Sequence, residues 1–476
     1  MANPFKQIFA KRDERSAENL FSWDGAVPFS KSLLFSVQHM LALFVSNIGP
    51  IMVLCASVAA SGVEVDPSVL ENGIRTSIFL AGIGTLIQLF PLKVFGSRMP
   101  IFMGSSFTFL GVMTLIVIAY GFQAAFIATI IGGGLLAIIG IFSKYWIRFI
   151  KPIVSAIVVL ALGLSLIGVS IEQFVGISDM PSLALDYDWS VGWRYLLVAF
   201  VTLISSMVFQ SFARGIWKNM SIVVGLAVGY IAALCMPGTI DFSSLQVHSF
   251  TDVLDIPRPI FTLLTFSAGD FHLSAVISIA IVFLVSSTET IGTVSLIAEN
   301  VYGRAPSDKE ITGGIASVGL LGALSGAFGG IPMTSYVQSA GIVEQTKVVN
   351  RNALVFTPVM LILLSLSPIL ARLLLTVPNA VLGGLMVNIF GGIAYSGMKM
   401  ILACPRNTKT ATIVGLSLGL GFALTMVPSV TAAKFDNEFL NTLMLILQSP
   451  VISMFLISMT LCYALPERIN GDKVNN

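Results

Sequence analysis

The sequence predicts an all-α polytopic membrane protein, because its composition, its long apolar blocks and the placement of its charges agree. Of its 476 residues, 55% are hydrophobic and 11% are charged, and the mean hydropathy is +0.91. Soluble domains carry about 25% charged residues. A transmembrane β-barrel would show short alternating segments, whereas this sequence shows long apolar blocks. We therefore expect helices that cross a bilayer.

Fourteen transmembrane segments are expected, seven on each side of a polar stretch. The first seven cover 31–57, 71–92, 99–118, 122–143, 147–169, 190–211 and 219–237. The second seven cover 272–296, 310–329, 331–347, 353–374, 377–401, 407–427 and 442–464. Most of them approach the roughly 20 residues that a spanning helix needs. The chain then divides into an N-terminus (1–30), a first seven-segment repeat (31–237), a connector (238–271), a second seven-segment repeat (272–464) and a C-terminus (465–476).

The positive charges predict the orientation. With the N-terminus in the cytoplasm, all but five of the 26 Lys and Arg fall in cytoplasmic loops; the five are Arg75, Arg194, Arg258, Arg372 and Lys434. This partition satisfies the positive-inside rule. We expect both termini in the cytoplasm, an extracytoplasmic connector and residence in the inner or plasma membrane. No cleavable signal peptide is expected, because residues 1–30 are charged and the first apolar block is too long for one.

Two segments in matching places of the two halves look interrupted. An odd number of spans per half makes the halves enter the membrane from opposite sides, as in an inverted repeat. The third segment opens with Met99-Pro100 and the tenth with Ile331-Pro332, and both continue through small or β-branched residues. We expect each to run extended before it becomes helical. Paired interrupted segments are the best indication from sequence of a transporter site.

Three ionisable residues fall well inside spans: His39, Glu289 and Glu344. A carboxylate at the bilayer centre costs about 2.5–3.5 kcal/mol, so Glu289 is expected to face a cavity or a partner. It can donate a hydrogen bond when protonated and accept one when ionised. The alternative is a structural glutamate that ties helices together. Glu344 is either functional or an interfacial charge near Lys347, and His39 is either an interhelical hydrogen-bonding group or a proton carrier.

The interrupted segments also carry groups suited to a flat ligand. Ser105, Ser106 and Phe107 follow Gly104 in one, and Tyr336 and Gln338 stand in the other. Hydroxyl, amide and aromatic groups around a carboxylate suit a heterocycle with alternating donors and acceptors. Two helix N-termini at the midplane would add N–H donors and the positive ends of their dipoles.

Several other classes are disfavoured. The four cysteines, Cys55, Cys235, Cys404 and Cys462, are scattered, so neither a disulfide framework nor a metal site is expected. The sequence lacks HExxH and paired intramembrane aspartates, which argues against an enzyme. Rings of charge typical of a channel are absent. We expect no cofactor and no nucleic-acid partner.

Taken together, these residues resemble the nucleobase–ascorbate transporter family, also called nucleobase:cation symporter-2, which includes uracil and xanthine permeases. The resemblance spans the chain. It rests on five stretches: Gln38-His39, Gly104 to Phe107, Thr288 to Gly292, Pro332 to Gly341, and Thr346 to Arg351.

The resemblance implies an architecture and a set of roles. A core domain (segments 1–4 and 8–11) would move against a gate domain (5–7 and 12–14), usually within a homodimer. Short antiparallel strands in segments 3 and 10 would cradle the base. Glu289 matches the glutamate that hydrogen-bonds the base. Gln338 matches a position that holds glutamine in many purine carriers and glutamate in uracil carriers. The residues expected to line the pocket beside these two are Ser106, Phe107, Tyr336, Val337 and Ser339.

Three positions depart from the family pattern. Thr293 stands where Asp or His is usual, Val318 where an aspartate is usual, and Ser339 where an asparagine is usual. Either Glu289 alone carries the proton, or Glu344 substitutes, or coupling is altered or lost. The resulting expectation is a proton-coupled permease for an oxopurine such as xanthine or uric acid, working by an elevator movement. The alternatives are a uracil permease, or an anion, sodium-coupled or uncoupled transporter on the same fold.

Overall fold

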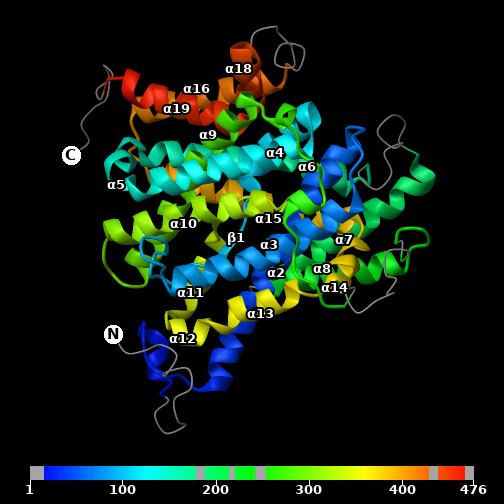
Figure 1. Cartoon of the computed structure of the whole chain (residues 1–476), viewed down its shortest axis with the longest axis horizontal. Helices are drawn as coiled ribbons and strands as arrows, with labels where there is room; N and C mark the ends of the chain where they lie inside the picture. Colours follow the sequence, from blue (N-terminus) through cyan, green and yellow to red (C-terminus); the bar gives the residue numbers. More distant parts are fainter. Residues whose placement is uncertain are drawn as a thin grey trace.

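The computed structural model describes residues 16–177, 188–213, 220–240, 242, 253–427 and 438–466. Within these ranges the regular secondary structure consists of helices, one two-stranded sheet and an isolated β-bridge between Leu92 and Phe95. Figure 1 shows long helices running side by side, with β1 (Met103–Ser105) near the middle of the molecule. The predicted all-α membrane architecture with short strands in the two interrupted segments is confirmed. The outer parts of the N-terminus and C-terminus, 1–15 and 467–476, lie outside the described residues.

The first seven predicted segments correspond to successive elements. They are α2 (Phe29–Ala60), α3 (Pro67–Leu89), β1 with η3 (Phe107–Phe109) and the first part of α4 (Leu110–Ile141), the second part of α4, α6 (Pro152–Phe174), α7 (Trp189–Phe212) and α8 (Ser221–Leu234). The short helices η2 (Glu18–Phe21), α5 (Ser143–Trp146) and η4 (Ile147–Phe149) lie between or before them. Lys151-Pro152 starts α6 with proline at the first helical position, where its missing N–H has no helical partner to lose.

The second seven follow in the same order. They are α9 (Leu273–Asn300), α10 (Asp308–Ala327), β2 (Met333–Ser335) with α11 (Val337–Thr346), the broken run α12 (Arg351–Leu354), α13 (Phe356–Ser365) and α14 (Pro368–Leu375), then α15 (Asn379–Leu402), α16 (Thr408–Thr425), and the pair α18 (Glu438–Gln448) and α19 (Pro450–Ala464). The described part of the connector contains η8 (Ile260–Thr262) and η9 (Ala268–Asp270).

The third and fourth predicted segments are joined in one helix that is broken at a glycine. At 32 residues, α4 would be about 48 Å long if straight, more than the roughly 30 Å of the hydrocarbon core. Gly121 has φ 88° and ψ 169°, which is non-helical. A residue with a Cβ rarely adopts this conformation, so the glycine permits the break. The two predicted spans therefore meet at Gly121.

The described residues contain eight helices that are long and apolar enough to cross a membrane, and two further bent pairs. The bent pairs are 351–365 with 368–375, at 80°, and 442–448 with 450–464, at 98°. Proline begins the second helix of each pair, at Pro368 and Pro450. Many large apolar side chains remain exposed on outer helix faces, including Phe200 at 50% and Ile204 at 55%. A chain with these features is a multi-pass membrane protein.

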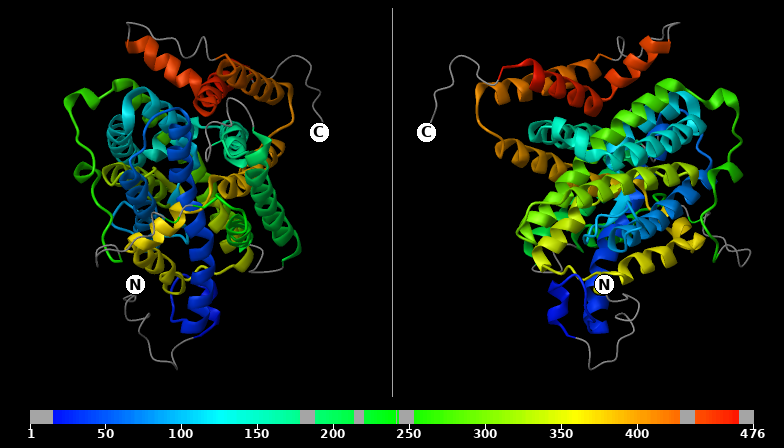
Figure 2. Two further views of the ribbon diagram at one scale, coloured as in Figure 1. Left: turned by 90° about the vertical axis from the view of Figure 1, so that its right-hand side faces the viewer. Right: turned by 60° about the vertical axis from the view of Figure 1, so that its left-hand side comes forward.

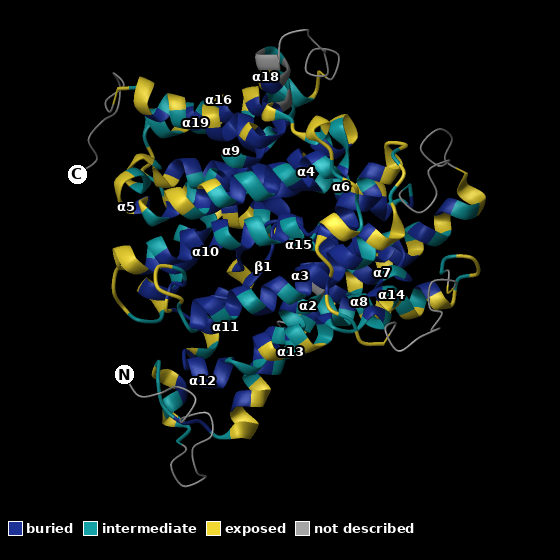
Figure 3. Ribbon diagram, viewed as in Figure 1, coloured by how far each residue is buried: buried dark blue, intermediate teal, exposed yellow. Residues whose placement is uncertain are grey.

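Matching segments of the two halves pack on one another at the centre. β1 pairs with β2, and α6 packs against α15. Figure 2 shows the helical bundle from two further sides. A Cβ at Gly163 of α6 would lie 2.3 Å from the Ala394 nitrogen, and one at Gly397 of α15 would lie 2.4 Å from the Leu160 nitrogen. The two helices therefore approach almost backbone to backbone. Buried residues fill the interior around this centre (Figure 3).

Candidate functional site

The two interrupted segments meet as a short antiparallel ladder. Met103 pairs with Ser335, and Gly104 pairs with Thr334. The ladder is extended at both ends, because the Ser106 N–H donates to the Pro332 carbonyl at 2.9 Å and the Tyr336 N–H donates to the Phe102 carbonyl at 2.8 Å. Backbone groups at membrane depth need such partners, since lipid supplies none. The ladder thus makes extended backbone tolerable in the middle of the protein.

Gly104 is required where the two strands cross. A Cβ at this position would lie 2.4 Å from a ring carbon of Tyr336. Real Cβ atoms essentially never come this close to another heavy atom. The Tyr336 ring therefore covers the face of β1 that a side chain would otherwise occupy.

Side chains from α2 and α3 hold β1 in place. The Asn47 Oδ1 accepts from the Ser105 N–H at 2.8 Å, while its Nδ2 donates to the Leu43 carbonyl at 2.7 Å. The Thr85 Oγ1 accepts from the Met103 N–H at 3.0 Å. Both anchors are fully buried. Each supplies a partner to a strand N–H that the ladder leaves free.

Each strand leads directly into a helix. Ser106 is the N-cap of η3, and its Oγ accepts from the Thr108 N–H at 3.3 Å. On the other side, α11 begins at Val337, immediately after Tyr336. Two helical segments therefore begin at the same place and direct N–H groups towards it. The N-terminus of a helix carries partial positive charge, which favours carbonyl-rich ligands.

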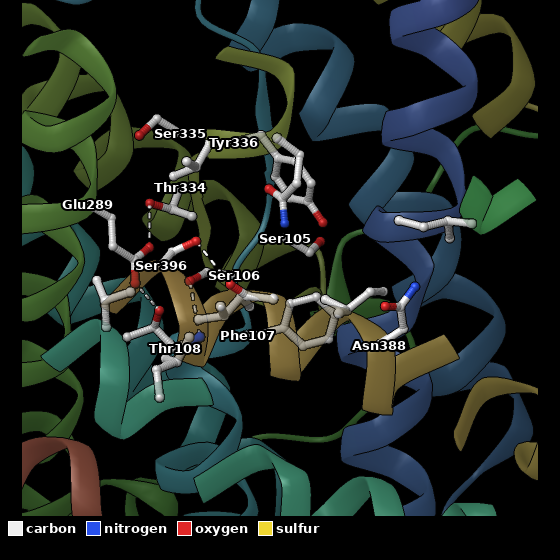
Figure 4. A pocket seen from close by; sticks show the side chains of 18 of the residues that line it. Ser105, Ser106, Phe107, Thr108, Glu289, Thr334, Ser335, Tyr336, Asn388 and Ser396 are labelled. Atoms are coloured by element: carbon white, nitrogen blue, oxygen red, sulfur yellow. Dashed lines mark hydrogen bonds between the residues drawn. The ribbon is translucent and has the colours of Figure 1, made fainter. Parts of the chain in front are cut away.

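Glu289 of α9 lies beside the strand crossing (Figure 4). It accepts hydrogen bonds from the Thr108 hydroxyl and from the Thr334 hydroxyl, the latter at 3.4 Å. Ser286 donates to Thr334 at 3.0 Å. Thr108 follows β1 and Thr334 belongs to β2, so the carboxylate links both halves of the chain. Charge-assisted bonds of this kind hold the carboxylate in place.

A cavity of about 370 Å³ opens in front of Glu289. One wall comes from the strand crossing and α9, and the opposite wall comes from α6, α7, α8 and α15. The lining is mostly apolar with a few polar groups, and the volume lies in the range of small-molecule sites. The lining residues are Ser105, Ser106, Phe107, Thr108, Val159, Leu162, Gln210, Ser221, Ile222, Glu289, Thr334, Ser335, Tyr336, Val337, Gln338, Asn388, Ile389, Gly392, Ile393 and Ser396.

Most of the predicted pocket residues share this cavity. Those that line it are Glu289, Gln338, Ser106, Phe107, Tyr336 and Val337. Ser339 does not: it is fully buried and stands outside the lining. Its place in the sequence next to Gln338 gave no information on which side of α11 it faces.

The other two residues considered for proton coupling lie elsewhere. His39 is fully buried and stacks on Phe102, with ring centroids 4.1 Å apart, and it does not line the cavity. Glu344 accepts from the Asn300 Nδ2 at 2.7 Å at an exposed site near the end of α11. Glu289 is therefore the one predicted coupling residue that reaches the cavity.

Two of the three positions that depart from the pattern of the nucleobase–ascorbate transporter family, Thr293 and Val318, hold neutral side chains in the protein interior. The Thr293 hydroxyl donates to the Glu289 main-chain carbonyl at 2.9 Å and accepts from the Ser335 hydroxyl at 3.2 Å. Val318 of α10 is fully buried. Neither position places a second ionisable group beside the cavity.

Comparison with known proteins decides the family. A family model described as Permease family matches residues 30–430. The chain belongs to this permease family. It is accordingly a transporter and not an enzyme.

The permease is similar to several named permeases of bacteria. It is 30% identical to the uric acid permease PucK of Bacillus subtilis, over 84% of this chain and 88% of that one. It is 29% identical to the xanthine permease of Bacillus subtilis, over 84% and 87%. It is also 29% identical to the xanthine permease XanQ of Escherichia coli K12, over 86% and 87%.

Solved structures share the fold of the permease at low identity. The transmembrane domain of the cyanobacterial bicarbonate transporter BicA aligns with a TM-score of 0.57 at 15% identity, over 94% of this chain and 99% of that one. The murine anion transporter Slc26a9, in its inward-facing state, aligns with a TM-score of 0.58 at 11% identity, over 91% and 75%. At such identities the likeness concerns the fold alone.

Sequence reasoning missed much of the second wall of the permease cavity. Gln210 of α7, Ser221 of α8 and Asn388 of α15 all line it. A usable signal was present, since Asn388, Gly392 and Ser396 recur every four residues, which places them on one helix face. Thr108, Thr334 and the anchor Asn47 were also missed. Among the described residues no group of three or more His, Cys, Asp or Glu could hold a metal ion.

Proposed function

We propose that this permease carries a nucleobase, specifically an oxopurine such as xanthine or uric acid, together with a proton. The observation that carries the proposal is Glu289, a carboxylate held at the strand crossing and open to a cavity of about 370 Å³ that Gln338 also lines. The names of the relatives support the substrate class, because several are xanthine or uric acid permeases.

The wall of the cavity that carries Glu289 suits the edge of such a base. Glu289 accepts from ring N–H groups, while Gln338 offers both an amide N–H and a carbonyl. Helix N–H groups at Phe107 and Val337 suit ring carbonyls. Phe107 and Tyr336 add aromatic surface, which favours a flat ligand. A carboxylate at this place disfavours anions, although the fold is shared with anion transporters.

Glu289 is also the group we assign to proton coupling. It is the one acidic or basic side chain that lines the cavity in the described structure. A protonated Glu289 is neutral and donates a hydrogen bond, so loading of the proton and of the base are linked through one side chain. Sodium coupling or uncoupled transport are the alternatives that the same cavity leaves open.

Movement of two domains completes the proposal. The core domain comprises α2–α4 and α9–α14, and the gate domain comprises α6–α8 and α15–α19. The cavity has walls from both. Core and gate touch where Phe107 packs edge-on against Phe390, with ring centroids 5.1 Å apart. An elevator movement breaks this contact. We further propose a homodimer in the inner or plasma membrane, with both termini in the cytoplasm.

Uptake into proteoliposomes tests the proposal. The purified full-length protein is given labelled xanthine, uric acid, uracil or adenine, with and without an inward proton gradient. We expect concentrative uptake of xanthine or uric acid that a protonophore abolishes. Glu289→Gln should bind or equilibrate the base without accumulating it. Normal accumulation by Glu289→Gln would refute its coupling role, and gradient-dependent uptake of uracil alone would favour the pyrimidine alternative.

A further inference from the structure

The cavity wall opposite Glu289 contains one polar stripe on α15. Asn388, Gly392 and Ser396 stand four residues apart and all line the cavity. Residues at this spacing lie on the same face of a helix. None of the three carries a large apolar side chain, although α15 is apolar enough to span a membrane. We call these three residues the α15 stripe.

Gly392 leaves open space in the middle of the α15 stripe. Apart from its chain neighbours and the backbone of its own helix, a Cβ at this position would have no protein atom within 4 Å. Other glycines of the same helix are explained by packing, since a Cβ at Gly383 would lie 2.3 Å from the Phe174 nitrogen of α6. At Gly392 the missing side chain adds room to the cavity instead of permitting helix contact.

Asn388 is held in a defined orientation at one end of the stripe. Its Nδ2 donates to the Ser206 hydroxyl at 3.3 Å and to the Gln210 Oε1 at 3.2 Å, both on α7. Figure 4 shows Asn388 across the cavity from Glu289. Because the Asn388 Nδ2 group already donates to two side chains of α7, the Asn388 Oδ1 is the atom that can accept a hydrogen bond from a ligand N–H. A few placed polar groups in an apolar pocket fix ligand orientation.

We infer that the α15 stripe sets the size of the ligand and selects a bicyclic base over a monocyclic one. This inference rests on the proposed function and names the residues that select its substrate class. Glu289 and Gln338 engage one edge of the base on the opposite wall. A second ring then extends towards α15 and occupies the space above Gly392, where Asn388 accepts from its N–H. A pyrimidine leaves that space empty.

The test fills this space and compares ligands of two sizes. Gly392→Val is matched with Gly391→Val, because Gly391 adjoins it, also has no atom within 4 Å of a Cβ, and does not line the cavity. Binding of xanthine, uric acid and uracil to the purified full-length protein is measured by titration calorimetry. In Gly392→Val we expect Kd for xanthine and uric acid to rise about tenfold or more, and Kd for uracil to change less than about threefold. Gly391→Val should bind all three as the wild type does.

The outcomes separate this inference from the proposed function. Unchanged xanthine binding in Gly392→Val, or equal losses for xanthine and uracil, would overturn the role of the stripe while leaving the permease a nucleobase carrier. A wild-type protein that binds none of these bases would refute the proposed function and this inference with it. If Gly392→Val does not fold, Gly392→Ala is measured in the same way, and a loss confined to the purines is again required. If the wild type binds purines only, Kd for xanthine is compared between Gly392→Val and Gly391→Val. A rise in Gly392→Val alone supports the role of the stripe, and equal values in the two variants overturn it.

Discussion

The contact between Gly104 and Tyr336 allows a prediction whose size follows from the structure. In Gly104→Ala the new Cβ would start 2.4 Å from one ring carbon of Tyr336 and 2.6 Å from the next. Carbon atoms at optimal contact are about 3.5–4.0 Å apart, so the ring or the strand must move by about 1 Å or more. Overpacking of this kind costs about 1–3 kcal/mol. Because both residues flank the cavity, we expect Gly104→Ala to lower the melting temperature and to weaken ligand binding as well.

A double-mutant cycle shows whether this contact is the cause. Melting temperatures are measured in detergent for the wild type, Gly104→Ala, Tyr336→Ala and the double variant. Removal of the ring in Tyr336→Ala is itself expected to destabilise, but it makes room for the methyl group. The cost of Gly104→Ala should therefore largely disappear in the Tyr336→Ala background. A cost of the same size in both backgrounds would refute the reasoning. Gly111→Ala is the matched control, since a Cβ there meets nothing within 4 Å.

Three other changes test Asn47 as the anchor of β1, Gln338 as a residue that selects the ligand, and the contact between the core and gate domains. Asn47→Ala leaves the buried Ser105 N–H without its partner; it should cost about 1–3 kcal/mol of unfolding free energy in thermal denaturation, and an unchanged melting curve would contradict the anchoring role. Gln338→Glu should shift competition for uptake towards uracil, and identical competition profiles in both proteins would show that Gln338 does not read the ligand. Phe390→Ala removes the edge contact with Phe107; we expect faster interconversion of the two transport states in counterflow exchange, whereas an unchanged exchange rate would exclude this contact as a barrier.

The broken segments show how far sequence reasoning reached into the site. Proline followed by small residues at Met99-Pro100 and Ile331-Pro332 predicted extended backbone, and the structure has β1 and β2 there. Such a break is a local property, because a bilayer penalises any backbone group without a partner and the sequence must mark the exception. Glu289 was found for a similar reason, since a carboxylate in an apolar block stands out by its cost.

The second wall of the cavity could not be found in the same way. The spacing of Asn388 and Ser396 places both on one face of α15, but nothing in the sequence of this helix says which other segments that face meets. Asn47 is similar, because its role depends on the Ser105 N–H, 58 residues away. Ser339 illustrates the opposite error: it stands next to Gln338 in sequence, yet the helical turn points it into the protein.

The sequence by itself determined the class of protein, the positions of the apolar segments, the two interruptions and the acidic residue at their crossing. These follow from hydropathy, chain length and the cost of polar groups in lipid, which act on each segment separately. Only the tertiary structure decided that His39 and Ser339 lie outside the cavity, that Asn47 and Thr85 hold β1, and that Gly392 leaves space opposite Glu289. Those facts depend on which helix faces meet, and that is settled by packing between segments far apart in the chain.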